Sequence, residues 1–157
     1  MQRLNYYPHF LKAFQKMTEI ETLIKESSFD HHLVHLVKLR ASQINGCALC
    51  VDTHSKEAKI DGERELRLYH VAVWEESPLF SEKEKAALLW TEHVTKLSQA
   101  PISDELFAKV KAQFSDKELT ELTMVIAMIN AWNRFGAPFR TTPGSMDKML
   151  GLDKAGL

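Results

Sequence analysis

A chain of 157 residues with 45% hydrophobic and 26% charged residues has the composition of one globular domain with a buried core. Its 20 Lys and Arg nearly balance its 21 Asp and Glu, so the net charge of −1 gives no electrostatic reason to expect a nucleic acid or an anionic membrane as partner. The apolar runs are too short to span a bilayer and the N-terminus lacks the layout of a secretory signal, so we expect a cytoplasmic protein.

The first half of the chain predicts four helices separated by capping and stop signals. After Pro8, apolar residues recur at spacings of three and four, as on one face of an amphipathic helix. Ser28 and Asp30 are candidate caps for the second helix, and the pair Asn45–Gly46 is a turn or stop signal after it. The expected helices cover about residues 9–25, 31–45, 47–62 and 63–74.

The second half contains two capping boxes, in which a serine is followed three residues later by a glutamate. Ser81 with Glu84 opens one helix, and Ser115 with Glu118 opens a long apolar one. The expected helices cover about residues 81–97, 103–114 and 115–134, with a less regular tail around Pro138 and Pro143. Strand signals are scarce, and no repeat or linker divides the chain. We therefore predict an all-α fold, a bundle of six to seven helices forming a single domain over 1–157.

The stretch QINGCALCVDTH, residues 43–54, contains the side chains that predict chemistry. On a helix Cys47, Cys50 and His54 fall at i, i+3 and i+7, so both sulfurs and the imidazole lie along one side. A Cys-x-x-Cys at a helix start lets a disulfide close with little backbone movement. In a cytoplasmic protein such a pair is typical of a reactive or metal-binding dithiol rather than of a static structural bridge.

Two effects activate different thiols of this pair. The unpaired amides of the first helical turn stabilise an anion and act most on Cys47. His54 lies one turn beyond Cys50 and acts chiefly on that thiol. A helix terminus contributes about 0.3–1 kcal/mol at an exposed site, which need not outweigh a directly bonded histidine. The geometry leaves the order open and favours Cys50 as the attacking thiolate.

Other interpretations of the cysteines are a packing role and a metal site. Packing explains one cysteine on an apolar helix, but not two at this spacing with a histidine on the same face. A zinc site needs further ligands, and His35, His93 and Asp52 lack ligand-like spacing. We therefore expect a redox dithiol that uses neither a metal nor a cofactor.

The motif Cys-x-x-Cys-x-x-x-His preceded by LVKLRASQINGC resembles the AhpD-like branch of the carboxymuconolactone decarboxylase superfamily. The segments MQRLNYYPHFLKAF, SEKEKAALLWTEHVTKL and INAWNRFGAPFR are similar to the same branch. The resemblance implies an all-helical alkylhydroperoxidase that assembles into trimers or hexamers. Decarboxylase relatives lack the cysteine pair, so its presence favours the redox branch.

The resemblance also implies a role for each site residue. Cys50 attacks a hydroperoxide and becomes a sulfenic acid, Cys47 resolves it to a disulfide, and His54 relays the proton. A thiol-containing or lipoamide-type partner then restores the dithiol. The family's relay glutamate, twelve residues before the first cysteine, is His35 in this chain.

The histidine at position 35 passes a proton near neutral pH but supplies no carboxylate charge to hold an imidazolium. The relay is therefore expected to be weaker or shifted in pH, and His35→Glu to raise the rate. The alternative is that His35 is a hydrogen-bonded helix residue without catalytic duty.

Other functions and features stay open at this stage. The chain is alternatively a thiol-disulfide oxidoreductase or redox sensor with little peroxidase activity, or an oligomeric binding protein with vestigial cysteines. Several apolar helices in so short a chain also indicate a homo-oligomer. Polar residues of the late segment are expected to satisfy buried groups around the core: Asn130, Trp132, Asn133 and Arg134.

Overall fold

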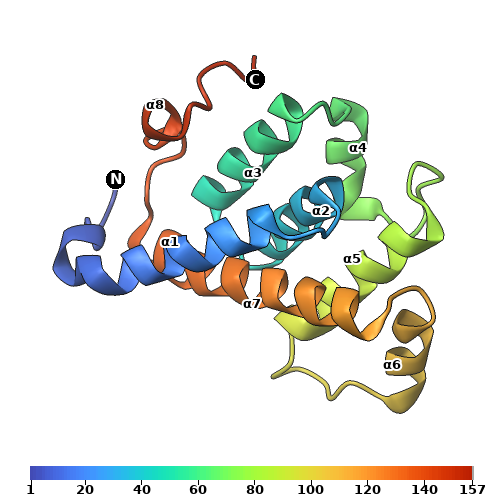
Figure 1. Ribbon diagram of the computed structural model, residues 1–157. Helices are drawn as coiled ribbons and strands as arrows, with labels where there is room; N and C mark the ends of the chain where they lie inside the picture. The colour runs from blue at the N-terminus through green and yellow to red at the C-terminus, as the bar shows by residue number, and fades with distance from the viewer. Residues whose placement is uncertain (157) are drawn as a thin grey trace.

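The computed structural model describes residues 1–156, and within that range the chain is helical with no strand (Figure 1). These residues form eight α-helices and two short 3-10 helices. The bounds are η1 (Tyr7–Phe10), α1 (Leu11–Glu26), α2 (His31–Ile44), α3 (Ala48–Ile60), α4 (Glu65–His70), η2 (Val71–Val73), α5 (Glu82–Thr95), α6 (Asp104–Lys111), α7 (Asp116–Phe139) and α8 (Asp147–Leu150). The predicted all-α class is confirmed. Within the same range, no helix has the length and apolar character needed to cross a bilayer.

The helices predicted from the sequence are present, but some differ in extent. The fourth stops at His70 as an α-helix and continues as the 3-10 turn η2. α7 runs on to Phe139 rather than ending near Arg134, and it includes Pro138. This proline lies in the last turn, so the hydrogen bond that its missing N–H removes is near the end of the helix. The helix ends at Arg140, whose φ and ψ of 50° lie in the left-handed region.

α2 is the central helix and packs against α3, α5 and α7. Val34 and Val37 join residues of α5 and α7 in one hydrophobic cluster, whereas Leu36 and Leu39 join residues of α3 to α5 in a second cluster. Leu36 and Val37 have no exposed surface. Full burial of such a side chain contributes about 1.5–3 kcal/mol. α2 is therefore held on two sides and is a firm base for the turn that follows it.

That turn places the first cysteine. The N–H of Cys47 donates to the carbonyl of Ser42 at 3.0 Å, and the N–H of Gly46 donates to the carbonyl of Gln43 at 3.2 Å. The two bonds form a Schellman motif, which requires the left-handed φ of 64° at Gly46 and therefore favours glycine there. The stop predicted at Asn45–Gly46 is confirmed, and the chain leaves it directly into α3.

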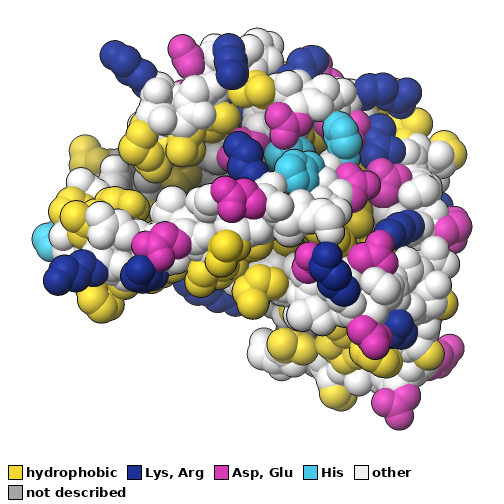
Figure 2. Space-filling model, in the orientation of Figure 1, with side chains coloured by type: hydrophobic (Ala, Val, Ile, Leu, Met, Phe, Trp, Pro, Cys, Tyr) yellow, Lys and Arg dark blue, Asp and Glu magenta, His cyan; other side chains and the backbone are white. Residues whose placement is uncertain are grey.

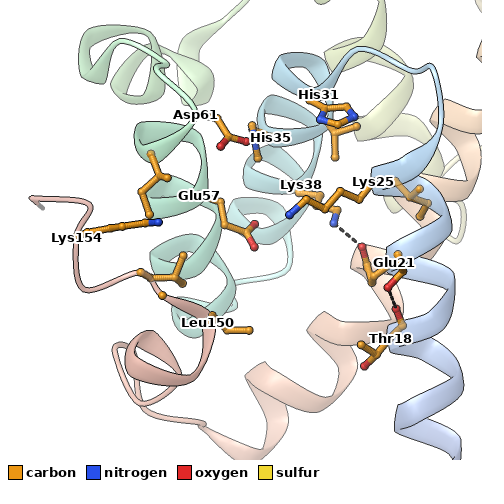
Figure 3. Close-up of a pocket in the computed structure, with 16 residues that line it drawn as sticks. Thr18, Glu21, Lys25, His31, His35, Lys38, Glu57, Asp61, Leu150 and Lys154 are labelled. Atoms are coloured by element: carbon orange, nitrogen blue, oxygen red, sulfur yellow. Dashed lines mark hydrogen bonds and ion pairs between the residues drawn. The ribbon is translucent and has the colours of Figure 1, made fainter.

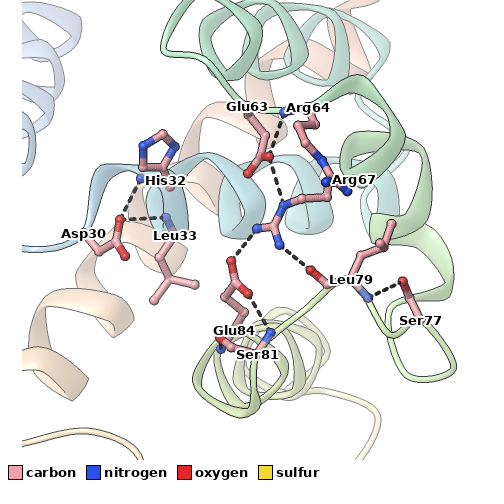
Figure 4. Close-up of polar contacts among 10 residues, drawn as sticks. All are labelled: Asp30, His32, Leu33, Glu63, Arg64, Arg67, Ser77, Leu79, Ser81 and Glu84. Carbon is pink, nitrogen blue, oxygen red and sulfur yellow. Dashed lines mark hydrogen bonds and ion pairs between the residues drawn. The ribbon is translucent and has the colours of Figure 1, made fainter.

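Arg67 joins α4 to the start of α5 (Figure 4). Its Nε donates to Glu63 at 2.9 Å, and its other nitrogens bond the Leu79 carbonyl and Glu84. Glu84 also accepts from the N–H of Ser81 in the capping box of α5. Such charge-assisted bonds are stronger than neutral ones, so they fix the connection between the two helices. Both capping boxes predicted from the sequence are present.

The C-terminal segment folds back onto α3. Lys56 of α3 bonds Asp52 at 2.9 Å and Asp147 of α8 at 2.6 Å, and the N–H of Gly144 donates to Asp52 at 2.9 Å. Leu152 is buried. The tail is thereby tethered by charge and by apolar contact, and it forms one wall of a pocket beside α3.

Candidate redox site

Cys47 and Cys50 form a disulfide at the start of α3, with their Cα atoms 5.3 Å apart. Cys47 is the N-cap residue, and its Sγ accepts the N–H of Cys50 at 3.4 Å. α3 therefore begins at Ala48, one residue after the cysteine that the sequence placed at its opening. Cys47 therefore lies at the positive end of the helix, where the sequence analysis expects the stronger helix-terminus effect.

Both sulfurs rest on the backbone of α7 at Gly136. A Cβ at this position would lie 2.6 Å from the Sγ of Cys47 and 3.2 Å from the Sγ of Cys50. Ala41 and Ile129 complete the buried cluster around the pair. Cys47 has no exposed surface, whereas Cys50 retains 5%. Gly136 lies in the segment INAWNRFGAPFR but was not singled out in the sequence, although an isolated glycine in a helix is the signal that marks a close approach.

An amide network fixes the turn before Cys47 onto α7. The Nδ2 of Asn45 donates to Asn130 at 3.0 Å and to Asn133 at 2.8 Å. Asn133, which is 1% exposed, in turn donates to the hydroxyl of Ser42 at 3.2 Å. These amides, of which Asn133 is buried and the others are part-buried, satisfy one another, which is the structural duty expected for the late segment.

His54 lies on α3 one turn beyond Cys50 and is 9% exposed. Residues four apart on a helix have Cβ atoms about 5–6 Å apart, which brings this imidazole to the side of the Cys50 thiol. Its Nδ1 bonds the Oε2 of Glu57 at 2.7 Å. The bond orients the ring and leaves Nε2 to exchange a proton.

Glu57 is a site residue that the sequence reasoning missed, although its i+3 spacing from His54 on a helix was the available signal. Burial by itself would raise the pKa of this carboxyl. The hydrogen bond from His54 and the positive charges that His54, Lys38 and His35 carry in acid outweigh burial and lower the pKa to about 2. Glu57 is therefore ionised at neutral pH.

His35 lies on α2 and is 9% exposed, but it bonds Asp61 rather than His54. The contact joins Nε2 of the ring to Oδ2 of Asp61 at 2.7 Å. Burial lowers the pKa of His35 more than the bond to Asp61 and the charge of Glu57 raise it. The ring is neutral at pH 7, and its buried Nδ1 has no hydrogen-bond partner among residues 1–156.

Two hollows flank the site. A pocket of about 550 Å³ lies between α1, α2, α3 and the C-terminal segment (Figure 3). Its wall includes His35, Lys38, Glu57, Asp61 and Lys154, and Figure 2 shows histidine, basic and acidic side chains close together on this face above α1. A second hollow of about 350 Å³ lies on the sulfur side, lined by residues next to the disulfide: Gly46, Ala48, Gly136, Ala137, Arg140, Thr141.

Cys50 and His54 thus lie one turn apart on α3, Cys47 caps the same helix, and His35 lies on α2, which packs against α3. Within the described part of the chain, no three His, Cys, Asp or Glu side chains form a group suited to a metal ion.

The sequence model of the carboxymuconolactone decarboxylase family matches residues 8–93. The chain belongs to this family. It is 37% identical to the uncharacterized protein YdfG of Bacillus subtilis over 133 residues, which cover 85% of this chain and 90% of YdfG. It is 36% identical to the uncharacterized protein YnjA of Escherichia coli over 114 residues, which cover 72% of this chain and 62% of YnjA.

Similarity to a protein of known crystal structure places this chain in the AhpD-like branch of the family. The Agrobacterium tumefaciens protein ATU0492, of unknown function and a candidate antioxidant defence protein AhpD, is 40% identical with a TM-score of 0.87, covering 91% of this chain and 98% of that one. The debrominase Bmp8 is 18% identical with a TM-score of 0.75, covering 89% of this chain and 74% of Bmp8. At that identity the likeness to Bmp8 shows the fold alone.

Proposed function

We propose that the protein is a thiol-dependent peroxidase that reduces hydroperoxides with the Cys47–Cys50 dithiol and His54 as proton relay. The observation that carries the proposal is the disulfide at the N-terminus of α3, one helical turn from a histidine that is bonded to an ionised carboxylate. Membership of the AhpD-like branch supports the same chemistry.

The catalytic cycle starts from the reduced dithiol. The thiol of Cys50 gives its proton to Nε2 of His54, and the thiolate attacks the terminal oxygen of the hydroperoxide. The O–O bond breaks, the leaving alkoxide takes the proton back from His54, and the products are an alcohol and a sulfenic acid on Cys50. The residual exposure of Cys50, against none for Cys47, supports Cys50 as the attacking residue.

The second half of the cycle closes and reopens the disulfide. The sulfur of Cys47 attacks the Sγ of Cys50, the S–OH bond breaks, and hydroxide leaves as water with the proton of the Cys47 thiol. An external dithiol or thiol partner, of the lipoamide or small-protein type, then supplies two electrons and two protons and leaves oxidised. No cofactor is required at any of these steps.

The assembly proposed with this function is a homo-oligomer, a trimer or hexamer, in the cytoplasm. Exposed apolar residues support it, since Phe107 is 46% and Met124 48% exposed beside a groove of about 540 Å³ that also includes Trp90. Light scattering on the purified chain measures the subunit number, and a monomer at micromolar concentration would contradict the proposal.

Stopped-flow mixing of the reduced protein with organic hydroperoxides tests the activity. We expect each chain to lose both thiols, Cys50→Ser to abolish peroxide consumption, and Cys47→Ser to stop at a sulfenic acid that dimedone traps. If the double cysteine variant consumes peroxide as fast as the wild type, the proposal is wrong. If the wild type exchanges electrons with lipoamide, thioredoxin or glutathione but not with peroxide, the chain is a thiol-disulfide oxidoreductase instead.

A further inference from the structure

Glu57 is a half-buried carboxylate on the same helix as the redox pair, and nothing in the family pattern used above assigns it a duty. We propose that Glu57 is the positioning residue of His54 and takes over the carboxylate duty that is vacant at position 35. This inference rests on the proposed function and deepens it, since it concerns the same proton relay.

The first support is the bond itself. The Oε2 of Glu57 lies 2.7 Å from Nδ1 of His54, and the two residues are one turn apart on α3, so the backbone of a single helix sets their distance. Nδ1–H donates to the carboxylate, which fixes the tautomer with Nε2 as the base. When Nε2 takes the proton of Cys50, the imidazolium faces a negative charge and the thiolate–imidazolium pair is stabilised.

The second support is that the neighbouring carboxylates have other partners. Asp61, the C-cap residue of α3, bonds His35 at 2.7 Å. Glu21 of α1 bonds Lys38 of α2 at 2.6 Å. Among the residues that the structure describes, Glu57 is therefore the carboxylate that contacts His54.

The positively charged side chains around Glu57 keep its carboxylate ionised. Lys38 and His35 of α2 and His54 of α3 lower its pKa to about 2, and Lys25 of α1 and Lys154 of the tail line the same pocket. Figure 3 shows Glu57 and Lys38 facing the pocket from opposite helices. A carboxylate at this place thus carries its full charge over the pH range in which a thiol titrates.

The third support is that small molecules can reach Glu57 through a pocket. Glu57 lines the pocket of about 550 Å³, whereas the two cysteines and His54 do not. A small carboxylate that enters this pocket can therefore occupy the place of a deleted Glu57 side chain without meeting the sulfurs. This property makes the duty of Glu57 testable by chemical rescue.

The decisive test is thiolate formation, which needs no peroxide. In a Cys47→Ser background, the ultraviolet absorbance of the Cys50 thiolate is titrated against pH with Glu57 and with Glu57→Gln. Glutamine keeps the shape of the side chain but not its charge. We therefore expect the midpoint of the Cys50 thiolate titration to move to higher pH by about one unit, which makes the thiolate fraction about tenfold smaller at a pH well below the midpoint. An unchanged midpoint would overturn the inference, even if the chain is an active peroxidase.

The kinetic test separates positioning from folding. We expect Glu57→Gln to lower the rate of peroxide reduction by roughly 10- to 100-fold with little change in KM, by analogy with the loss found when the hydrogen-bond partner of a metal-bound histidine is mutated. Glu57→Ala is expected to regain at least a tenth of the wild-type rate in formate, whereas chloride at equal ionic strength has no effect. Glu65→Gln, an exposed carboxylate bonded to Lys59, is the matched control and keeps the wild-type rate.

The outcomes are distinct from a failure of the proposed function. If wild type consumes no peroxide but Glu57→Gln shifts the thiolate titration, the positioning role stands and the peroxidase proposal falls. If Glu57→Gln does not fold, the formate response of Glu57→Ala and the titration of Glu57→Asp decide, since aspartate keeps the charge but shortens the reach. Failure of formate to raise the rate or the thiolate fraction of folded Glu57→Ala contradicts the inference.

Discussion

Gly136 of α7 and Cys47, the N-cap of α3, are in such close contact that a Cβ at position 136 would lie 2.6 Å from the cysteine sulfur. The side-chain-free face of this glycine is what lets the disulfide lie flat against α7. α7, which the sequence predicts from its capping box and apolar pattern, thus provides the backbone surface against which the disulfide packs.

Gly136→Ala is expected to destabilise the oxidised protein by about 1–3 kcal/mol, because the added methyl group overpacks a site with no space for it. Denaturant unfolding of the oxidised protein measures the change. The matched control is the same substitution in a Cys47→Ala background, where the closest sulfur is gone and the loss should be smaller. Equal losses in the two backgrounds would show that the contact with Cys47 is not the cause.

Asn45→Ala is expected to lower the free energy of unfolding by about 1–3 kcal/mol. The substitution removes the donor to Asn130 and Asn133 and leaves the buried Oδ1 of Asn133 without it. Thermal and denaturant unfolding measure the loss. A change within experimental error would mean that water replaces the lost donor. Gln99→Ala, an exposed change in a loop, is a suitable reference.

His35→Glu is expected to destabilise the protein by about 1–3 kcal/mol and not to accelerate peroxide reduction. The new carboxylate would face Asp61, which now accepts from His35 at 2.7 Å, and would lie near the ionised Glu57. This reverses the expectation drawn from the sequence, in which a glutamate at position 35 restores the relay. Stopped-flow rates and unfolding curves are measured beside His35→Gln, and a faster His35→Glu would support the original expectation.

Stability is expected to fall as the pH is lowered below about 6.5, the ordinary pKa of histidine, because the pKa of His35 is lower in the folded protein. Just below pH 6.5, His35 is protonated to a greater extent in the unfolded chain than in the folded one, so acid favours unfolding. Glu57 adds a separate loss between about pH 4.5 and 2, since its folded pKa is lowered. Unfolding curves from pH 7 to 5 for wild type and His35→Gln measure the first effect, and identical slopes would contradict it.

Lys56→Ala is expected to loosen the C-terminal segment and to lower the free energy of unfolding by about 1–3 kcal/mol, because its two ion pairs are part-buried and both carboxylates lose a hydrogen-bond partner. The substitution removes the bonds to Asp52 and Asp147 that tether the tail to α3. Limited proteolysis detects the change as faster cleavage within residues 141–156. Lys59→Ala, whose partner Glu65 lies away from the tail, should leave that cleavage rate unchanged.

The sequence predicts well whatever is local in the chain. Helix starts at Ser81 and Ser115 and the stop at Gly46 follow from hydrogen bonds within a few residues, and all three are present. Contacts between residues distant in the sequence cannot be predicted in this way. The close approach of Gly136 to the two sulfurs, for example, depends on how α7 crosses α3.

Position 35 shows the same limit within the site. Comparison with the family pattern identifies a missing carboxylate, but only the packing of α2 against α3 reveals that His35 faces Asp61. The i+3 spacing of Glu57 from His54 is visible in the sequence, but many surface residues have the same spacing. Only the burial of Glu57 and its bond to His54 in the structure distinguish it.

We expect reduction of the disulfide to change the fold little, since the bridge closes a ring of residues only three apart along the chain. A cross-link that spans so little sequence removes very little entropy from the unfolded chain, in contrast to bridges that join distant segments. For the proposed function this means that the Cys47–Cys50 pair is expected to cycle between its two redox states at a small cost in stability.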